Sequence, residues 1–122
     1  MSLSACDGLL VFQPKKSEYY QIYLDNVLFF EHRDRKVIIH TLDMEYQILN
    51  ISLTKVEKVV GNYGFIRTHR AYIVQTKKIY KLVDCGDRTA QIFFHNKCKK
   101  TAYLSRSYRH KFPFFANNIG TI

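Results

Sequence analysis

The stretch from Gly64 to Gln75, with the sequence GFIRTHRAYIVQ, sets three cationic side chains between two short apolar runs. The flanking residues are β-branched or aromatic, as is typical of strands. By contrast, Arg67, His69 and Arg70 would each cost several kcal/mol if they were buried without a partner. The pattern therefore predicts a strand, a tight turn and a second strand, with His69 and Arg70 exposed at the turn.

An arginine that a rigid turn holds in solvent has two interpretations. Its guanidinium group can meet a guanine edge or a phosphate as a two-pronged fork, and a neighbouring histidine can donate to either. The simpler interpretation is that Arg67 pairs with an acidic neighbour and Arg70 is only solvated. The turn alone does not decide between them.

Short apolar runs separated by polar turns recur along the whole chain. From Val27 to Leu49 they predict a three-stranded meander whose first turn is the charged tip Arg33 to Lys36. We expect an all-β fold with one short helix, in which elongated antiparallel sheets and hairpins present basic loops. The predicted strands outside the central stretch are Leu9–Phe12, Glu18–Leu24, Val27–His32, Val37–Thr41, Tyr46–Leu49, Ile79–Val83, Thr89–Phe94 and Thr101–Leu104.

One helix is predicted. Asn50 or Ser52 can cap it, and its apolar positions begin at Leu53 with helical spacing. We expect it to end at Gly61 and Asn62, which tolerate left-handed geometry. Little more than two turns is too short for a recognition helix, and a helix-turn-helix would need a second one.

The composition bounds the remaining possibilities. The 122 residues predict one domain, and a net charge of +9 with a pI near 9.6 calls for an anionic partner. Nucleic acid is the simplest such partner, although an acidic protein or a membrane surface fits the charge equally well. The three cysteines, odd in number and without C-x-x-C spacing, predict reduced thiols in the cytoplasm. No apolar run reaches the roughly 20 residues of a membrane span, so we expect no membrane insertion.

The expected organisation is a leading segment over residues 1–17, a folded domain over residues 18–115 and a tail over residues 116–122. The leading segment is interpreted as a cloning scar at Met1 to Leu3 followed by a linker.

Catalytic and metal chemistry find little support in the sequence. His95 and Cys98 stand three residues apart, but a zinc site needs three or four convergent ligands and no second pair follows at a finger-like distance. There is no nucleophile elbow and no phosphate loop. We expect no enzyme activity, no metal site and no cofactor.

Four clusters of basic and hydroxyl residues fall at predicted turns: Arg33–Lys36, Thr68–Arg70, Thr76–Lys78 and Ser105–Lys111. Such residues can simply keep loops in solution. If the turns gather at one end of the sheets, they form a continuous cationic ridge suited to a nucleic acid.

The run FIRTHRAYIV, residues 65–74, resembles the signature of the LytTR-type DNA-binding domain of bacterial response regulators and related transcription factors. The resemblance extends from Tyr19 to Phe115. It departs from the family at Ala71, where Ser is commoner, and at Gln75, where Asn is usual, and we expect both positions near the DNA face. Supporting pieces in the family's order are VLFFE at 27–31, ISLTKVE at 51–57 and LSRSYR at 104–109.

The resemblance implies that loops on a β-scaffold enter successive major grooves, with a minor-groove contact between them. It implies base contacts by Arg70 and Arg106, with Arg35 and Lys36 as further candidates at the hairpin tip. His69 is expected to contact DNA or, preferably, to brace its turn, and Arg67 to be structural. The expected contacts to the DNA backbone come from Lys77, Ser105, Ser107 and Arg109.

The resemblance further implies a bacterial transcriptional regulator that is monomeric in solution and binds paired direct repeats as two copies. A receiver or membrane-bound sensor domain is expected in a longer parent chain. Two alternatives stay open at this point. One is a module for single-stranded nucleic acid, with bases stacked on Tyr19, Tyr20, Tyr23, Phe93 and Phe94. The other is a basic protein-interaction domain.

Overall fold

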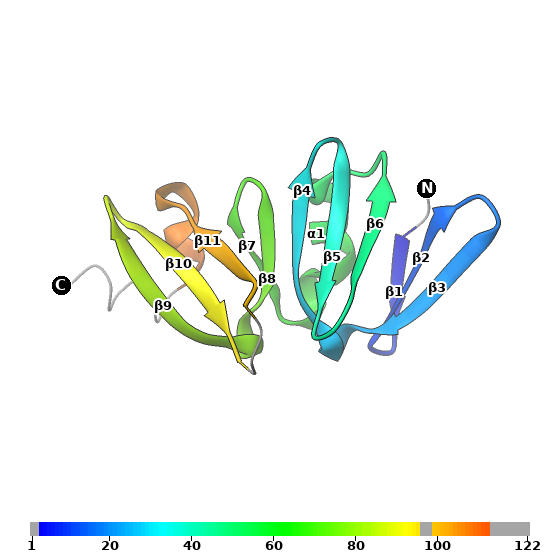
Figure 1. Cartoon of the computed structure of the whole chain (residues 1–122), viewed down its shortest axis with the longest axis horizontal. Coiled ribbons are helices and arrows are strands. Elements are labelled where there is room, and N and C mark those ends of the chain that lie inside the picture. Colours follow the sequence, from blue (N-terminus) through cyan, green and yellow to red (C-terminus); the bar gives the residue numbers. More distant parts are fainter. Residues whose placement is uncertain (1–2, 96–98, 113–122) are drawn as a thin grey trace.

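The computed structural model describes residues 3–95 and 99–112. Over these residues the strands form three antiparallel sheets, which follow one another along the long axis of the molecule (Figure 1). The expected all-β architecture with one short helix is confirmed. The first sheet has the order β1-β2-β3 and consists of β1 (Leu3–Cys6), β2 (Leu9–Lys15) and β3 (Glu18–Tyr23).

The middle sheet has the order β6-β5-β4-β8-β7. The meander expected over residues 27–49 is confirmed in β4, β5 and β6, and β8 adds to the free side of β4. The strands are β4 (Val27–Arg33), β5 (Lys36–Thr41), β6 (Glu45–Leu49), β7 (Phe65–His69) and β8 (Tyr72–Gln75).

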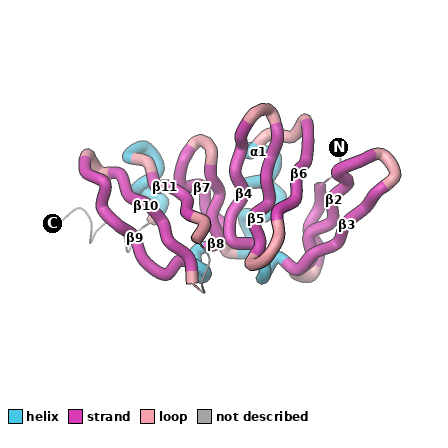
Figure 2. The backbone as a smooth tube through the Cα atoms, in the orientation of Figure 1, coloured by secondary structure: helices cyan, strands magenta, loops and turns pink. Residues whose placement is uncertain are grey.

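The third sheet has the order β11-β10-β9. It consists of β9 (Ile79–Gly86), β10 (Thr89–Phe94) and β11 (Thr101–Leu104). Single turns of 3₁₀ helix join the sheets: η1 (Leu24–Asn26) precedes β4, and η3 (Thr76–Lys78) precedes β9. Figure 2 shows how completely strands dominate the described chain.

The helix α1 (Leu53–Val60) begins as its capping signal predicts. The Ser52 side chain accepts a hydrogen bond from the Lys55 amide at 3.1 Å, and the apolar positions Leu53, Val56 and Val60 are buried. The helix also ends at Gly61 as expected, but the left-handed geometry expected there is wrong. Gly61 keeps a right-handed conformation, the chain continues through the 3₁₀ turn η2 (Gly61–Tyr63), and the left-handed residue is Gly64, with φ +84°.

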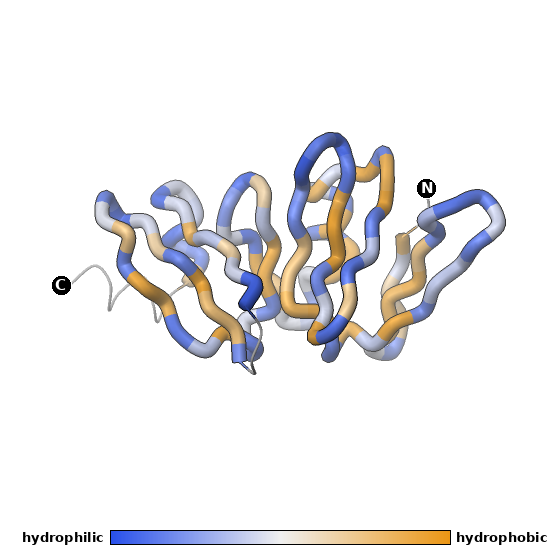
Figure 3. Tube along the Cα trace, in the orientation of Figure 1, coloured by the Kyte–Doolittle hydropathy of each residue, from blue (hydrophilic) through white to orange (hydrophobic). Residues whose placement is uncertain are grey.

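Two apolar cores lie on opposite faces of the middle sheet. Val27 and Phe30 of β4 point into the first core, with the first sheet and α1, whereas Leu28 and Phe29 point into the second, with the third sheet. The register shift between Val27 and Phe29 explains how two consecutive residues face the same side. Figure 3 shows apolar residues along the strands and hydrophilic residues at the hairpin tips.

The leading segment contributes to the packed fold. Leu3, Leu10 and Phe12 are buried in the first core, although Leu3 was expected to lie in a cloning scar. A two-residue turn at Asp7 and Gly8, both with positive φ, joins β1 to β2. The domain boundaries stay a prediction, and residues 113–122, which contain the expected tail, lie outside the described residues.

Gln75 ends β8 as a buried polar side chain. Its Nε2 donates hydrogen bonds to the carbonyl oxygens of Leu24, at 3.1 Å, and Val27, at 2.6 Å. The expectation that Gln75 lies near the DNA face is therefore wrong, because the side chain ties the end of β8 to the start of β4 within the fold.

We predict that Gln75→Met, which keeps the side-chain volume but removes both donors, lowers the free energy of unfolding by about 1–3 kcal/mol. Two buried carbonyl groups would lose a partner. Urea denaturation measures the change, with the exposed Gln47→Met on β6 as the matched control. Equal stability of the two variants would contradict this account of Gln75.

Candidate nucleic-acid interface

The β4–β5 hairpin carries its charges on a two-residue turn. Arg33 pairs with Lys36 across the strands, so Asp34 and Arg35 form the turn, both with positive φ. Mirror-image turns of this kind match the twist of the flanking strands. Arg35 is exposed at the tip and Lys36 is half-buried.

The β7–β8 hairpin is held by an arginine that lies beneath its turn. The Arg67 guanidinium donates to the carbonyl oxygens of His69, at 3.0 Å, and Arg70, at 2.6 Å, and forms an ion pair with Glu57 of α1 at 3.3 Å. The structural role expected for Arg67 is confirmed. Arg70 itself is exposed at the turn beside Ala71.

His69 braces the same turn. Its Nδ1 accepts a hydrogen bond from the Ala71 amide at 3.0 Å, and its ring meets the Tyr72 ring edge-on with centroids 5.3 Å apart. Partial burial, followed by the positive charges of Arg70 and Arg67, lowers the pKa of His69. A neutral ring keeps its Nδ1 lone pair available, so this pKa direction agrees with the bracing contact.

These two hairpins lie side by side and point the same way. Strands β4 and β7 are each antiparallel to β8, so they run in the same direction and end at the same edge of the sheet. The His32 amide of β4 donates to the Ala71 carbonyl at 2.9 Å, which fixes one turn against the other. Figure 1 shows both turns along the upper edge.

Thr68 joins the third sheet to this edge. It is fully buried in the register shift of β7; its carbonyl accepts a hydrogen bond from the Ser105 amide at 2.8 Å, and its hydroxyl donates to the Tyr103 carbonyl at 2.9 Å. The end of β11 is thereby aligned with the end of β7. Arg106 and Ser107, which begin the 3₁₀ helix η4 (Arg106–Lys111), are both exposed there.

The β9–β10 turn also lies at this edge, next to the start of η4. Asp87 and Arg88 form the β9–β10 turn, and Asp87 Oδ1 lies 3.3 Å from Arg106 Nη1. Arg70 and Arg106 therefore lie along one edge of the molecule, as a shared DNA site requires. We call this surface the cationic edge and define it by Arg35, Lys36, Arg70, Ser105, Arg106 and Ser107.

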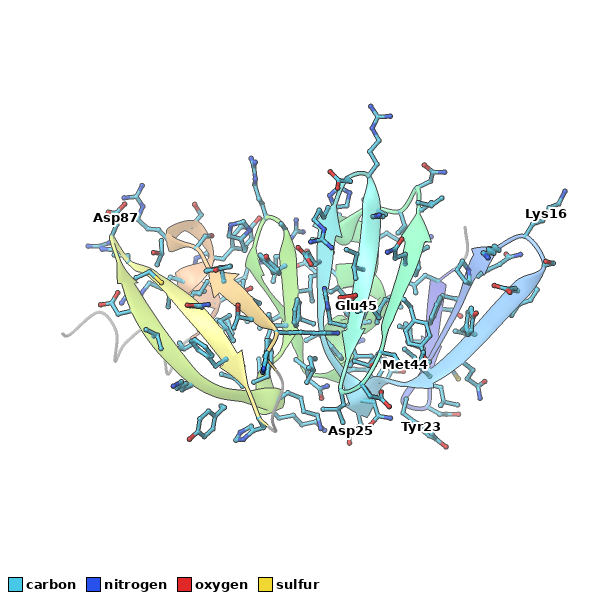
Figure 4. All side chains as sticks on the ribbon, in the orientation of Figure 1. Lys16, Tyr23, Asp25, Met44, Glu45 and Asp87 are labelled. Carbon is cyan, nitrogen blue, oxygen red and sulfur yellow. The ribbon has the colours of Figure 1, made fainter. Side chains whose placement is uncertain are left out.

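The structure separates Lys77 from the cationic edge. Lys77 lies in η3, after β8 has run back across the sheet, and its Nζ is 3.0 Å from Asp25 Oδ1. The hydrogen bond from Lys77, together with the charge of Lys78, lowers the pKa of Asp25. Figure 4 shows Asp25 at the edge opposite Asp87. A single ridge that includes all four clusters is therefore wrong for the cluster Thr76–Lys78.

The helical turn η4 is anchored rather than free. The Tyr108 ring contacts two cations, with Arg67 Cζ 5.8 Å and Lys111 Nζ 5.3 Å from its centroid. Lys111 also lies 3.5 Å from Glu57, on α1. Arg109 is half-buried with its Nε enclosed, so it presents less of its side chain than Arg106 does.

Sequence reasoning missed the roles of Thr68 and Asp87. Thr68 was counted with the exposed turn residues, but it is buried, and its partners Tyr103 and Ser105 come from a distant part of the chain. The sequence does predict a hairpin turn over Asp84–Arg88 with Gly86 at positive φ, and the structure bears this out, but nothing local shows that Asp87 meets Arg106.

The aromatic platform proposed for single-stranded nucleic acid is not assembled. Phe94 is buried in the second core, and Tyr20 packs against Phe12 of the first sheet and Tyr46 of the middle sheet. The exposed Tyr19 and Tyr23 lie on β3 in that first sheet, while Phe93 belongs to the third sheet.

Over residues 3–95 and 99–112, no three His, Cys, Asp or Glu side chains converge in a way that could hold a metal ion. Cys98 lies outside this range. None of the helices in the same residues is long and apolar enough to cross a membrane.

Comparison with known proteins agrees with this geometry. A family model described as the LytTr DNA-binding domain matches residues 17–114. A solved structure, the LytTr DNA-binding domain of a putative methyl-accepting/DNA response regulator from Bacillus cereus, is similar with a TM-score of 0.74 and 19% identity; the match covers 89% of this chain and 96% of that chain. No curated protein gives a significant match.

We predict that the His69 ring titrates below the pKa of about 6.5 that a histidine has in an unfolded chain. The unfolded chain takes up the proton first. The stability that neutral His69 contributes is therefore present above about pH 6.5 and is lost as the pH falls through the lower folded-state pKa. NMR titration of the ring protons measures this pKa directly.

His69→Asn serves as the control, because it keeps an acceptor for the Ala71 amide without titrating. It should lose less unfolding free energy than the wild type between about pH 7 and about pH 5. Equal losses, or a ring pKa at or above the ordinary value, would contradict the bracing role.

Proposed function

Since the chain belongs to the LytTR DNA-binding domain family, we propose that it reads specific sequences in double-stranded DNA through its cationic edge. The family binds DNA and is not catalytic. The observation that supports the proposal is the alignment of the β4–β5 turn, the β7–β8 turn and the start of η4 at one edge of the molecule.

The basic side chains of this edge have different roles in recognition. Arg35 and Arg70 lie at hairpin turns, Lys36 begins β5 and Arg106 begins η4. From these positions their side chains can reach base edges in successive grooves. Ser105, Ser107 and Arg109 donate to phosphates, and His69 holds its turn in shape. Lys77 has no part in this interface, because it lies at the opposite edge, paired with Asp25.

Rigid tips favour base reading over diffuse electrostatic binding. Hydrogen bonds from Arg67 fix the β7–β8 turn, and the His32 amide fixes it to the neighbouring hairpin. A side chain on such a turn loses less conformational freedom on binding than one on a flexible loop. The scattered positions of Tyr19, Tyr23 and Phe93 argue against the alternative, a module for single-stranded nucleic acid.

The biological setting follows from the same proposal. The chain acts in the bacterial cytoplasm as the output domain of a transcriptional regulator, within a longer protein that carries a receiver or sensor domain. It is monomeric in solution and two copies bind paired direct repeats. The relative from Bacillus cereus is itself described as a response regulator.

Selection of binding sites from a random duplex pool, followed by fluorescence anisotropy, tests this function. The selected duplex should bind more tightly than a scrambled duplex and than either single strand. Affinity should fall with salt by about 0.9 in log-log slope for each duplex phosphate contacted. Preference for single strands would support the alternative module, and affinity independent of salt would support the protein-interaction domain.

We predict that Arg70→Ala and Arg106→Ala each weaken binding to the selected duplex by about 1–3 kcal/mol and change binding to a scrambled duplex little. Each removes a fork that can satisfy guanine O6 and N7. Lys77→Ala is the matched control, because it removes one exposed cation from the opposite edge. Equal weakening on both duplexes would show that these arginines contact only phosphates.

A further inference from the structure

Asp87 places a negative charge on the cationic edge. It opens the two-residue β9–β10 turn, and its Oδ1 accepts a hydrogen bond from Arg106 Nη1 at 3.3 Å. Both side chains are open to solvent, 83% for Asp87 and 64% for Arg106. Among the described residues, Asp87 is the one acidic side chain paired with any of the four cations proposed to read bases.

Neither folding nor general DNA affinity accounts for an aspartate here. An ion pair this exposed contributes little to stability, since solvent screens it. The turn needs positive φ, which is 54° at Asp87, but asparagine adopts that conformation equally well without a charge. On a surface that meets phosphates, the carboxylate is repelled.

We propose that Asp87 is a specificity-determining residue, which positions the Arg106 guanidinium for a guanine edge and disfavours duplexes that lack one. This inference rests on the proposed function. It assigns a role in DNA recognition to the β9–β10 turn, which the sequence analysis did not connect with DNA binding.

The pairing geometry supports the positioning step. The contact with Asp87 engages one terminal nitrogen, Nη1, and the Arg106 side chain has no other hydrogen bond among the residues that the structure describes. The guanidinium group has five N–H donors in a planar fork. Its other nitrogens are therefore free to donate to guanine O6 and N7 while the carboxylate holds Nη1 beside the β9–β10 turn.

The charge of Asp87 supports the discrimination step. On a matching site Arg106 keeps both partners, so the carboxylate stays neutralised. On another sequence the fork finds no guanine, and a phosphate, as a second anion, competes with Asp87 for the guanidinium group. The unpaired carboxylate then faces the DNA backbone and weakens the complex.

Anisotropy with the selected and scrambled duplexes tests the inference on wild type, Asp87→Asn, Arg106→Ala and the double variant. Asp87→Asn should bind the scrambled duplex about 3- to 10-fold more tightly and the selected duplex within about 2-fold of wild type. The ratio of the two affinities should therefore fall by about 3- to 10-fold. In the Arg106→Ala background, Asp87→Asn should leave that ratio unchanged.

Asp34→Asn is the matched control. Asp34 also opens a two-residue hairpin turn, with φ 54°, on the same edge of the molecule, and no ion pair joins it to another described residue. Its neutralisation should strengthen binding to both duplexes equally. If Asp87→Asn also strengthens both equally, or changes the ratio without Arg106, the inference is overturned.

The affinities of the wild type distinguish failure of the proposed function from failure of the role assigned to Asp87. If the wild type shows no preference for the selected duplex, the proposed function fails before any variant is compared. If it shows that preference and Asp87→Asn keeps the same ratio, only the role of Asp87 fails. Thermal unfolding of each variant confirms that the folded protein is being compared.

Discussion

The arrangement of the proposed DNA-binding edge depends on the buried threonine Thr68. Its carbonyl and hydroxyl bind the backbone on both sides of the β11 terminus, at Ser105 and Tyr103. The third sheet would otherwise touch the middle sheet mainly through apolar side chains, which do not fix register. The two directional hydrogen bonds that Thr68 makes fix the end of β11 against the end of β7, and with it the position of Arg106 relative to Arg70. The spacing between these two arginines is therefore a property of the scaffold.

The middle sheet makes this scaffold stiff because both of its faces are packed. The first core lies against one face and the second core against the other. Close packing on both sides limits bending of the hairpins. Polar contacts hold both edges of this scaffold. At the cationic edge, hydrogen bonds from Arg67 and the His32 amide hold the two turns in place. At the opposite edge, Gln75 ties the end of β8 to the start of β4, and Lys77 pairs with Asp25.

Local features of this fold were predictable from sequence, whereas the placement of its turns was not. Period-two patterns located the hairpins, and Ser52 located the start of α1, because these signals depend on neighbours in the chain. Lys77 resembled the other basic turns, but strand direction carries it to the opposite edge. Leu3 was set aside for its position at the terminus, although it is buried in the first core, where β1 packs against α1. Contacts between distant segments decided both cases, as they did for Thr68.

The most direct test of the account is an NMR titration of the ¹⁵N-labelled protein with its selected duplex. The account predicts that the amides perturbed most belong to the turns at Arg35, Arg70 and Asp87 and to the start of η4. The amides of η1 and η3, at the opposite edge, should change little. Perturbations centred on η3 or on the exposed tyrosines of β3 would contradict it.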